Sequence, residues 1–171
     1  MWTGVASSEV MNALLVALTP PNRLAVEMSM RYGMRIGDVL ATKTEDVRKG
    51  RWTYKEEKTG KSRRITLSSA FQCRLLQQSG RIYCFEHRTD YKRHRSRQAV
   101  YKDIKRAARA FRVDNIAPHS YRKKYAVDAY HRSGDLKKVQ RLMNHSSEAV
   151  TMLYALADTI SCPKKRTAQK K

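Results

Sequence analysis

The sequence predicts a mainly α-helical domain with one small antiparallel β-sheet, an α+β fold. Apolar residues recur at helical spacing in several segments, for example at Val10, Leu14 and Leu18. Between residues 46 and 67 the pattern changes to β-favouring residues interrupted by glycines. With 41% hydrophobic residues in a chain of 171, one compact core is expected.

Two helices are expected at the start of the chain. The first covers about residues 9–18 and stops at the following Thr-Pro-Pro-Asn stretch, where prolines oppose its continuation. The second runs from about residue 22 to residue 33, which is a glycine. Arg35 therefore lies just past a helix end, in a short segment that leads to Leu40.

Residues 46–67 predict the sheet. Trp52 and Tyr54 alternate with polar neighbours, and Val47, Ile65 and Leu67 are also β-favouring. The tip of the expected hairpin is Lys58-Thr59-Gly60-Lys61, which is expected to be exposed, mobile and doubly basic. A basic tip suits a finger that reaches a phosphate or a groove, although a solvated turn has the same composition.

The second half of the chain predicts helices separated by one basic loop at residues 86–97. We expect this loop to face a polyanionic partner, which the net charge of the chain predicts. The helices are expected near residues 69–79, 98–111, 119–131 and 135–143, and a last one begins at Ser146 or Ser147 and contains Tyr154. The domain is expected to cover residues 1–160, and the basic segment 161–171 to be a disordered tail.

The charge predicts a polyanionic partner. The chain has 36 Lys and Arg against 15 Asp and Glu, a formal net charge of +21 at pH 7. A generally solvated basic surface would also account for part of this excess. No run reaches the roughly 20 apolar residues of a membrane helix, and no leader is seen, so an intracellular protein without a membrane partner is expected.

Neither a disulfide framework nor a metal site is expected. The three cysteines are odd in number and far apart, which favours free thiols in a reducing compartment. Cys84, His87 and His94 are the best zinc candidates, but their spacing is irregular and a fourth ligand is not evident. We expect no metal and no cofactor.

Several side chains suit attack on a phosphodiester. Guanidinium groups hold non-bridging oxygens, imidazoles and ammonium groups move protons, and a phenol can act as the nucleophile. His119 and Arg122 are three residues apart, so they share one face near the start of their helix, where anions are favoured. The candidate set, in chain order, is Arg35, Lys58, His119, Arg122, His145 and Tyr154.

The order and separations of these residues resemble the tyrosine recombinase (phage integrase) family. There are 22 residues between Arg122 and His145, and eight between His145 and Tyr154. The resemblance spans residues 33–154. It is carried by Gly33-Met34-Arg35-Ile36-Gly37-Asp38, Lys58-Thr59-Gly60-Lys61-Ser62-Arg63, Pro118-His119-Ser120-Tyr121-Arg122, Leu142-Met143-Asn144-His145 and the later Tyr154.

The resemblance implies the fold of a tyrosine recombinase catalytic domain and a role for each matching residue. In the family a phenol attacks the scissile phosphorus, forms a 3′-phosphotyrosyl link and frees a 5′-hydroxyl, without a cofactor. Carried over, the roles are nucleophile for Tyr154, oxygen clamp for Arg35 and Arg122, general base for His119, hydrogen-bond donor for His145, general acid for Lys58, and support for Asp38.

The chain also departs from the family pattern. Met143-Asn144-His145 stands where Leu-Gly-His is common, Tyr121 replaces an aliphatic residue, and Lys123 follows where histidine is frequent. None of these changes removes a catalytic group. The amino-terminal DNA-clamping (core-binding) domain of most members is expected to be absent from this chain, since no room for it precedes Ser8.

The expected partner is double-stranded DNA at a recombination site. The resemblance implies a monomer when free and a homotetramer on DNA, in the cytoplasm at the nucleoid, acting in integration or excision of a phage or mobile element. Relaxation of one duplex, as by a type IB topoisomerase, and non-catalytic DNA binding are the alternatives. Further DNA contacts are expected from Lys61, Arg63, Arg93, Arg95, Arg97, Lys102 and Lys105.

Overall fold

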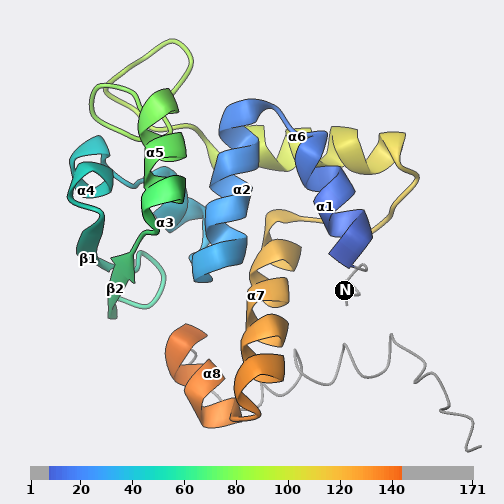
Figure 1. The fold of residues 1–171 in the computed structure, drawn as a ribbon. Helices are drawn as coiled ribbons and strands as arrows, with labels where there is room; N and C mark the ends of the chain where they lie inside the picture. Colours follow the sequence, from blue (N-terminus) through green and yellow to red (C-terminus); the bar gives the residue numbers. More distant parts are fainter. Residues whose placement is uncertain (1–7, 144–171) are drawn as a thin grey trace, which may run out of the picture.

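The computed structural model describes residues 8–143, in which the chain forms eight helices and two strands. The predicted last helix and the predicted tail lie outside these residues. In the described part, no helix has the length and apolar character needed to cross a bilayer. Figure 1 shows the arrangement of α1 (Ser8–Val16), α2 (Pro20–Tyr32), α3 (Ile36–Leu40), α4 (Thr44–Lys49), β1 (Arg51–Lys55), β2 (Ser62–Thr66), α5 (Ser69–Gln78), α6 (Arg97–Ala110), α7 (Pro118–Ser133) and α8 (Leu136–Met143).

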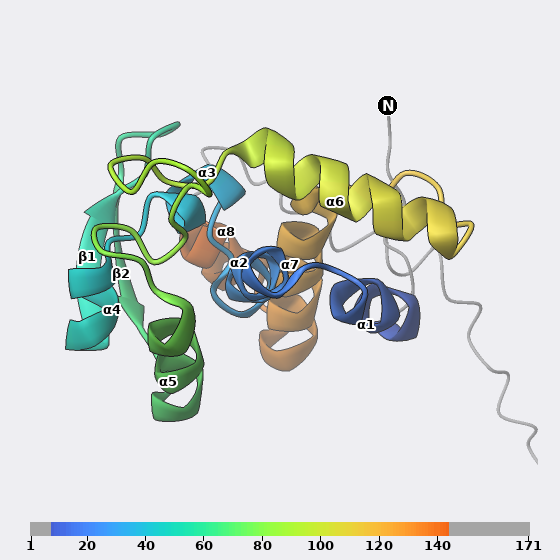
Figure 2. The same ribbon diagram turned by 90° about the horizontal axis from the view of Figure 1, so that it is seen from above.

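Helices α2 and α7 pack together at the centre of the molecule. The hairpin, α4 and α5 lie on one side of this pair, and α1 lies on the other. Seen from above, α6 runs past α2 and α7 to α1 (Figure 2). The chain therefore brings the α2–α3 junction, the hairpin and the start of α7 to one region.

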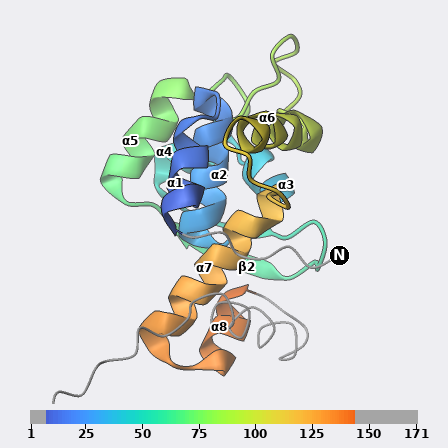
Figure 3. The same ribbon diagram turned by 90° about the vertical axis from the view of Figure 1, so that its right-hand side faces the viewer.

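The core of residues 8–143 consists of two clusters. The larger one joins α1 to α6 with the hairpin and the start of α7, and it contains Trp52, Ile65 and Phe71. The smaller one joins α7 to α8 and consists of Ala126, Ala129, Val139 and Met143, with Tyr125 and Tyr130 packed against it. Figure 3 shows α8 beside the far end of α7, away from α6. Helix α8 therefore depends on α7 for its burial.

The hairpin has the predicted antiparallel form. Trp52 pairs with Ile65 across the two strands, and both side chains are buried. Tyr54 pairs with Arg63, and the connecting turn carries Lys58 and Lys61 on exposed positions. Alternate burial along each strand is what a sheet with one face on the core requires.

The first strand is shorter than the predicted strand region. Residues 46–49, including Val47, belong to helix α4 and not to a strand, so this part of the prediction is wrong. Val47 is fully buried, and it belongs to a helix of six residues that is capped by Gly50 with φ +67°. The acidic residues of its first turn and the left-handed glycine at its end favour a helix over a strand.

Two further features differ from the sequence prediction. Helix α2 begins at Pro20, because proline fits the first turn, where its missing N–H is not needed. The short segment before Leu40 is helix α3. In the second half, α6, α7 and α8 agree with the predicted helices to within two residues. Ser96 caps α6 by accepting from the N–H of Ala99, and Asp135 accepts from the N–H of Lys138 at 3.0 Å, as expected of a cap.

Candidate active site

Four of the six predicted catalytic residues line one pocket. Arg35 comes from the α2–α3 junction, Lys58 from the hairpin turn, and His119 and Arg122 from the first turns of α7. The pocket has a volume of about 180 Å³. It is lined by Ser29, Arg35, Ile36, Gly37, Lys58, Arg97, Pro118, His119 and Arg122.

The end of helix α2 presents Arg35. Gly33 ends the helix in the left-handed region at φ +62°, and Met34 is fully buried beyond it. The hydroxyl of Ser29 donates to the carbonyl of Met34 at 2.7 Å, which fixes the turn. Arg35 then precedes the first residue of α3, and 23% of its side chain is exposed. The guanidinium can therefore reach the pocket from a turn held by a hydrogen bond and by the buried side chain of Met34.

Arg122 is the most deeply placed cation of the pocket, with 2% of its surface exposed. Its Nη2 donates to the carbonyl of Met143 at 2.7 Å, whereas Nη1 is buried and has no hydrogen-bond partner among the described residues. Burial, followed by the charges of Arg35 and Arg63, lowers the pKa of Arg122 to about 10. The group is charged at neutral pH and offers a donor for an anion.

His119 lies in the first turn of α7 on a solvent-exposed position. Loss of hydration in the pocket, followed by the positive charges of Lys123, Arg122, Arg35 and Lys58, lowers its pKa to about 4. The imidazole is therefore neutral at pH 7 and can accept a proton.

Lys58 is exposed on the turn between β1 and β2. The turn is closed by the N–H of Gly60, which donates to the carbonyl of Glu56 at 2.9 Å. Thr59 donates its hydroxyl to the Glu56 carboxylate at 2.6 Å. The lysine is thus carried by a turn with defined hydrogen bonds.

Two carboxylates are buried beside the arginines. Asp38, the predicted supporting residue, is 7% exposed and accepts from the N–H of Glu57 at 3.0 Å. Burial, and to a lesser extent the charge of Glu56, raises the pKa of Asp38. Glu56 was not singled out by the sequence, yet its carboxylate lies 2.5 Å from Nη1 of Arg35. The only sequence signal was an acidic pair directly before Lys58.

Two tyrosines near the pocket, Tyr121 and Tyr54, are poor nucleophiles. Tyr121 is fully buried, and burial raises its pKa to about 12. Burial likewise raises the pKa of Tyr54 to about 12. His145 and Tyr154, the remaining two predicted catalytic residues, lie outside the described residues.

The predicted DNA contacts occupy three kinds of position. Arg97 lines the pocket itself, and Lys61 and Arg93 are exposed. Arg63 turns inward: its Nη1 donates to the carbonyl of Gly33 at 3.0 Å and its Nη2 to that of Tyr32, so its placement does not support DNA contact. Arg95 is half-buried, and burial lowers its pKa.

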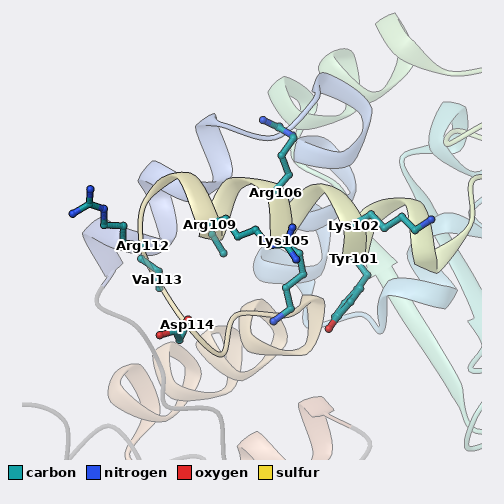
Figure 4. A pocket seen from close by; sticks show the side chains of 9 residues that line it. Tyr101, Lys102, Lys105, Arg106, Arg109, Arg112, Val113 and Asp114 are labelled. Atoms are coloured by element: carbon teal, nitrogen blue, oxygen red, sulfur yellow. The ribbon is translucent and has the colours of Figure 1, made fainter.

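Lys102 and Lys105 lie along a groove on α6 of about 930 Å³ (Figure 4). The ammonium of Lys105 lies 5.6 Å from the ring centre of Tyr101, which is itself 46% exposed. A groove that combines cations with an aromatic ring suits an anionic polymer. It is lined by Tyr101, Lys102, Lys105, Arg106, Ala108, Arg109, Arg112, Val113 and Asp114.

The zinc candidates do not come together. Cys84 is buried with its thiol 3.9 Å from the carbonyl of Leu75, and His94 contacts the carbonyl of Arg95 through Nδ1 at 2.8 Å. Within residues 8–143, no three His, Cys, Asp or Glu residues are grouped as a metal site would require.

Comparison with known proteins shows to which family the whole sequence is related. Residues 6–159 match the model of the phage integrase family. The chain is 30% identical over 125 residues to the probable integrase/recombinase YoeC of Bacillus subtilis, covering 71% of this chain and 69% of YoeC. It is 27% identical over 156 residues to the integrase of Escherichia phage P2, covering 90% of this chain but 43% of that protein.

Solved structures share the fold. The XerA recombinase superposes with a TM-score of 0.71 at 18% identity, over 91% of this chain and 61% of XerA. The catalytic domain of bacteriophage HP1 integrase superposes with a TM-score of 0.67 at 16% identity, over 98% of this chain and 100% of that domain. The chain thus spans about half of most longer relatives and the whole of an isolated catalytic domain. It belongs to the phage integrase family.

Proposed function

We propose that this chain is the catalytic domain of a tyrosine-type site-specific DNA recombinase, which cuts and rejoins strands through a 3′-phosphotyrosyl intermediate. The observation that carries the proposal is the pocket in which Arg35, Lys58, His119 and Arg122 converge from three separate regions of the chain. Membership of the phage integrase family supports the same chemistry. Integration or excision of a phage or mobile element is the proposed biological reaction.

Arg35 and Arg122 hold the two non-bridging oxygens of the scissile phosphate. Negative charge grows on these oxygens in the transition state, so fixed guanidinium groups in a partly dehydrated pocket stabilise it more than they stabilise the substrate. Nη1 of Arg122 is a buried donor without a partner among residues 8–143, which suits an incoming oxygen. Asp38 supports this cluster by its position beside Arg35.

The proton movements fall to His119 and Lys58. In the proposed step the phenol oxygen of Tyr154 attacks phosphorus, its proton passes to the neutral imidazole of His119, and the bond from phosphorus to the 5′-oxygen breaks. Lys58 gives a proton to that leaving oxygen, and His145 donates a hydrogen bond to the phosphoryl group. The phosphoester bond is conserved in the link to Tyr154, so no external energy source is needed.

Double-stranded DNA is the proposed substrate. The α6 groove with Lys102 and Lys105, together with Arg97 at the pocket, offers a basic path toward the chemistry. Lys61, Arg93 and Arg95 are further proposed contacts. Relatives of the same fold include lambda integrase, solved as a dimer bound to a core site, and XerH bound to its difH substrate. We propose a protein that acts on the chromosome in the cytoplasm, is monomeric when free and forms a tetramer on DNA.

A duplex with a nick close to the scissile phosphate tests the reaction, because cleavage then releases a short fragment and traps the covalent link. We expect a denaturation-resistant adduct from the wild type and none from Tyr154→Phe. Tyr130→Phe, on the far part of α7, is the matched control and should form the adduct. Adduct formation by Tyr154→Phe would refute the assignment of the nucleophile.

The same reagents separate the alternatives. Relaxation of supercoiled DNA without exchange between two duplexes would favour the topoisomerase-like reaction. Salt-sensitive binding without an adduct on any duplex would favour a non-catalytic binding module. Light scattering of the protein with and without a site-containing duplex measures the proposed change from monomer to tetramer.

A further inference from the structure

Glu56 is a buried carboxylate beneath the catalytic pocket, with 1% of its surface exposed. Its Oε2 accepts from Nη1 of Arg35 at 2.5 Å and from the hydroxyl of Thr59 at 2.6 Å. An ionised carboxylate in such a place is tolerated only where cations and hydrogen-bond donors compensate for lost hydration. Here the compensating groups are parts of the proposed site.

The second oxygen of Glu56 faces another arginine. Oε1 lies 3.6 Å from Nη1 of Arg63. Arg63 in turn donates to the carbonyls of Tyr32 and Gly33, the two residues at the end of α2. Glu56 therefore contacts Arg35 directly and, through Arg63, the backbone that presents it.

The backbone of Glu56 also frames the turn that carries Lys58. Its N–H donates to the carbonyl of Lys61 at 3.0 Å, and its carbonyl accepts from the N–H of Gly60 at 2.9 Å. The carboxylate binds the intervening Thr59. One residue is thus tied to both the arginine and the lysine of the proposed site, which are 23 positions apart in the sequence.

We propose that Glu56 is a positioning residue for strand cleavage, which holds the guanidinium of Arg35 and the Lys58 turn in place before DNA binds. This inference rests on the proposed recombinase function. Glu56 takes Nη1 of Arg35, so the remaining N–H groups of that guanidinium stay available for a phosphate oxygen. The hydrogen bond from Thr59 and the charge of Arg35 outweigh the effect of burial and lower the pKa of Glu56, so the carboxylate is ionised at neutral pH.

The charges of the cluster fit a positioning role. Three guanidinium groups, those of Arg35, Arg63 and Arg122, lie near two carboxylates, those of Asp38 and Glu56, which leaves one positive charge in excess. The carboxylates therefore limit the mutual repulsion of the arginines without cancelling their attraction for a phosphate. Neutralising Glu56 should misplace Arg35 without weakening DNA binding, since it removes a negative charge from a DNA-binding surface.

Glu56→Gln is the test, and Glu45→Gln is its matched control, because Glu45 is exposed in α4 and the charge change is identical. Single-turnover adduct formation on the nicked duplex should slow by roughly ten- to a hundredfold for Glu56→Gln, the range that follows from misplacing a catalytic group by about 1 Å. DNA affinity should be unchanged or higher. Glu45→Gln should match the wild type in both measurements.

A modified substrate separates positioning of the clamp from general damage. A methylphosphonate at the scissile position replaces one charged non-bridging oxygen by a methyl group, so the reaction depends less on the arginines. The defect of Glu56→Gln should then shrink to less than about threefold. An equal defect on both substrates, or a loss of DNA affinity that accounts for the slower reaction, would overturn the proposal.

A measurement without chemistry distinguishes failure of this inference from failure of the proposed reaction. ¹⁵N NMR of the guanidinium groups should show restricted rotation of Arg35 in the wild type and averaged Nη signals in Glu56→Gln, and Thr59→Val should leave Arg35 restricted. Free rotation of Arg35 in the wild type would refute the positioning role. Restricted rotation in a wild type that forms no adduct on any duplex would instead contradict the recombinase function alone.

Discussion

Replacing Arg122 by lysine separates the two tasks of its guanidinium. Nη2 donates to the carbonyl of Met143 at the end of α8, and Nη1 is directed to no acceptor in the described part of the chain. Lysine keeps the positive charge but has a single nitrogen, which cannot serve the Met143 carbonyl and a phosphate oxygen with the same geometry. The change therefore tests the clamp with little change in the net field.

The size of the effect follows from these two contacts. Loss of one preorganised donor to the transition state costs about 2.7–4 kcal/mol, a factor of roughly a hundred to a thousand in rate. Loss of the buried, charge-assisted bond to Met143 costs about 1.5–3 kcal/mol of unfolding free energy. For a domain of this size that corresponds to a fall in Tm of roughly 3–12 °C.

Single-turnover cleavage of the nicked duplex and thermal unfolding are measured on the same preparations. Arg48→Lys, on the exposed side of α4, is the matched control and should leave the rate and the Tm unchanged. The rate of Arg122→Lys is compared at a temperature where both proteins are folded. Cleavage by Arg122→Lys within about threefold of the wild type would refute the idea that a two-nitrogen donor at this position holds the phosphate.

Three further perturbations test the surroundings of the pocket. The pKa of His119 is about 4 in the folded protein, against 6.5 for an ordinary histidine, so the unfolded chain binds an extra proton between these pH values. The contribution of His119 to the unfolding free energy is therefore complete above pH 6.5 and is lost toward pH 4, and NMR titration of the native and the urea-unfolded protein measures both pKa values. Asp103→Ala removes the acceptor of two hydrogen bonds from Thr19, at 2.9 and 2.7 Å, and should lower the unfolding free energy by about 2–4 kcal/mol in urea titration while adduct formation persists below the new midpoint. Gly33→Ala places a methyl group at φ +62° and into the ring of Tyr125, so both the Tm and the cleavage rate should fall, because the end of α2 leads directly into Arg35 and α7 carries Arg122.

The helices could be predicted from the sequence where their apolar residues recur at helical spacing. Helix α6 has an apolar stripe over four turns and a serine cap, and its predicted ends agree with the structure to within one residue. Helix α4 has six residues, too few for periodicity to appear, and its one buried apolar residue, Val47, is β-branched. A strand was therefore predicted where the left-handed glycine at position 50 ends a helix.

The pocket was predictable only in part from local rules. The spacing of His119 and Arg122 on one helix predicts that they are neighbours, but not that Arg122 is buried while His119 stays exposed. Convergence with Arg35 and Lys58 depends on how α2 packs on α7 and where the hairpin folds, which no local pattern contains. Glu56 was missed for the same reason, since its ion pair with Arg35 is formed by tertiary structure alone.

In the proposed mechanism, the charge distribution of the pocket links DNA binding to proton transfer. In the absence of DNA, burial, followed by the charges of the cations around it, holds the pKa of His119 far below the ordinary value, so the imidazole is neutral but a weak base. A bound phosphodiester places a negative charge among those cations and offsets part of their field, which raises the basicity of the imidazole. In the proposed mechanism, the cations that would hold the phosphate are among the causes of the low pKa, so His119 is expected to be a better proton acceptor for Tyr154 when a substrate is in place. Under this proposal, ionisation of the nucleophile is favoured in the complex in which it can attack.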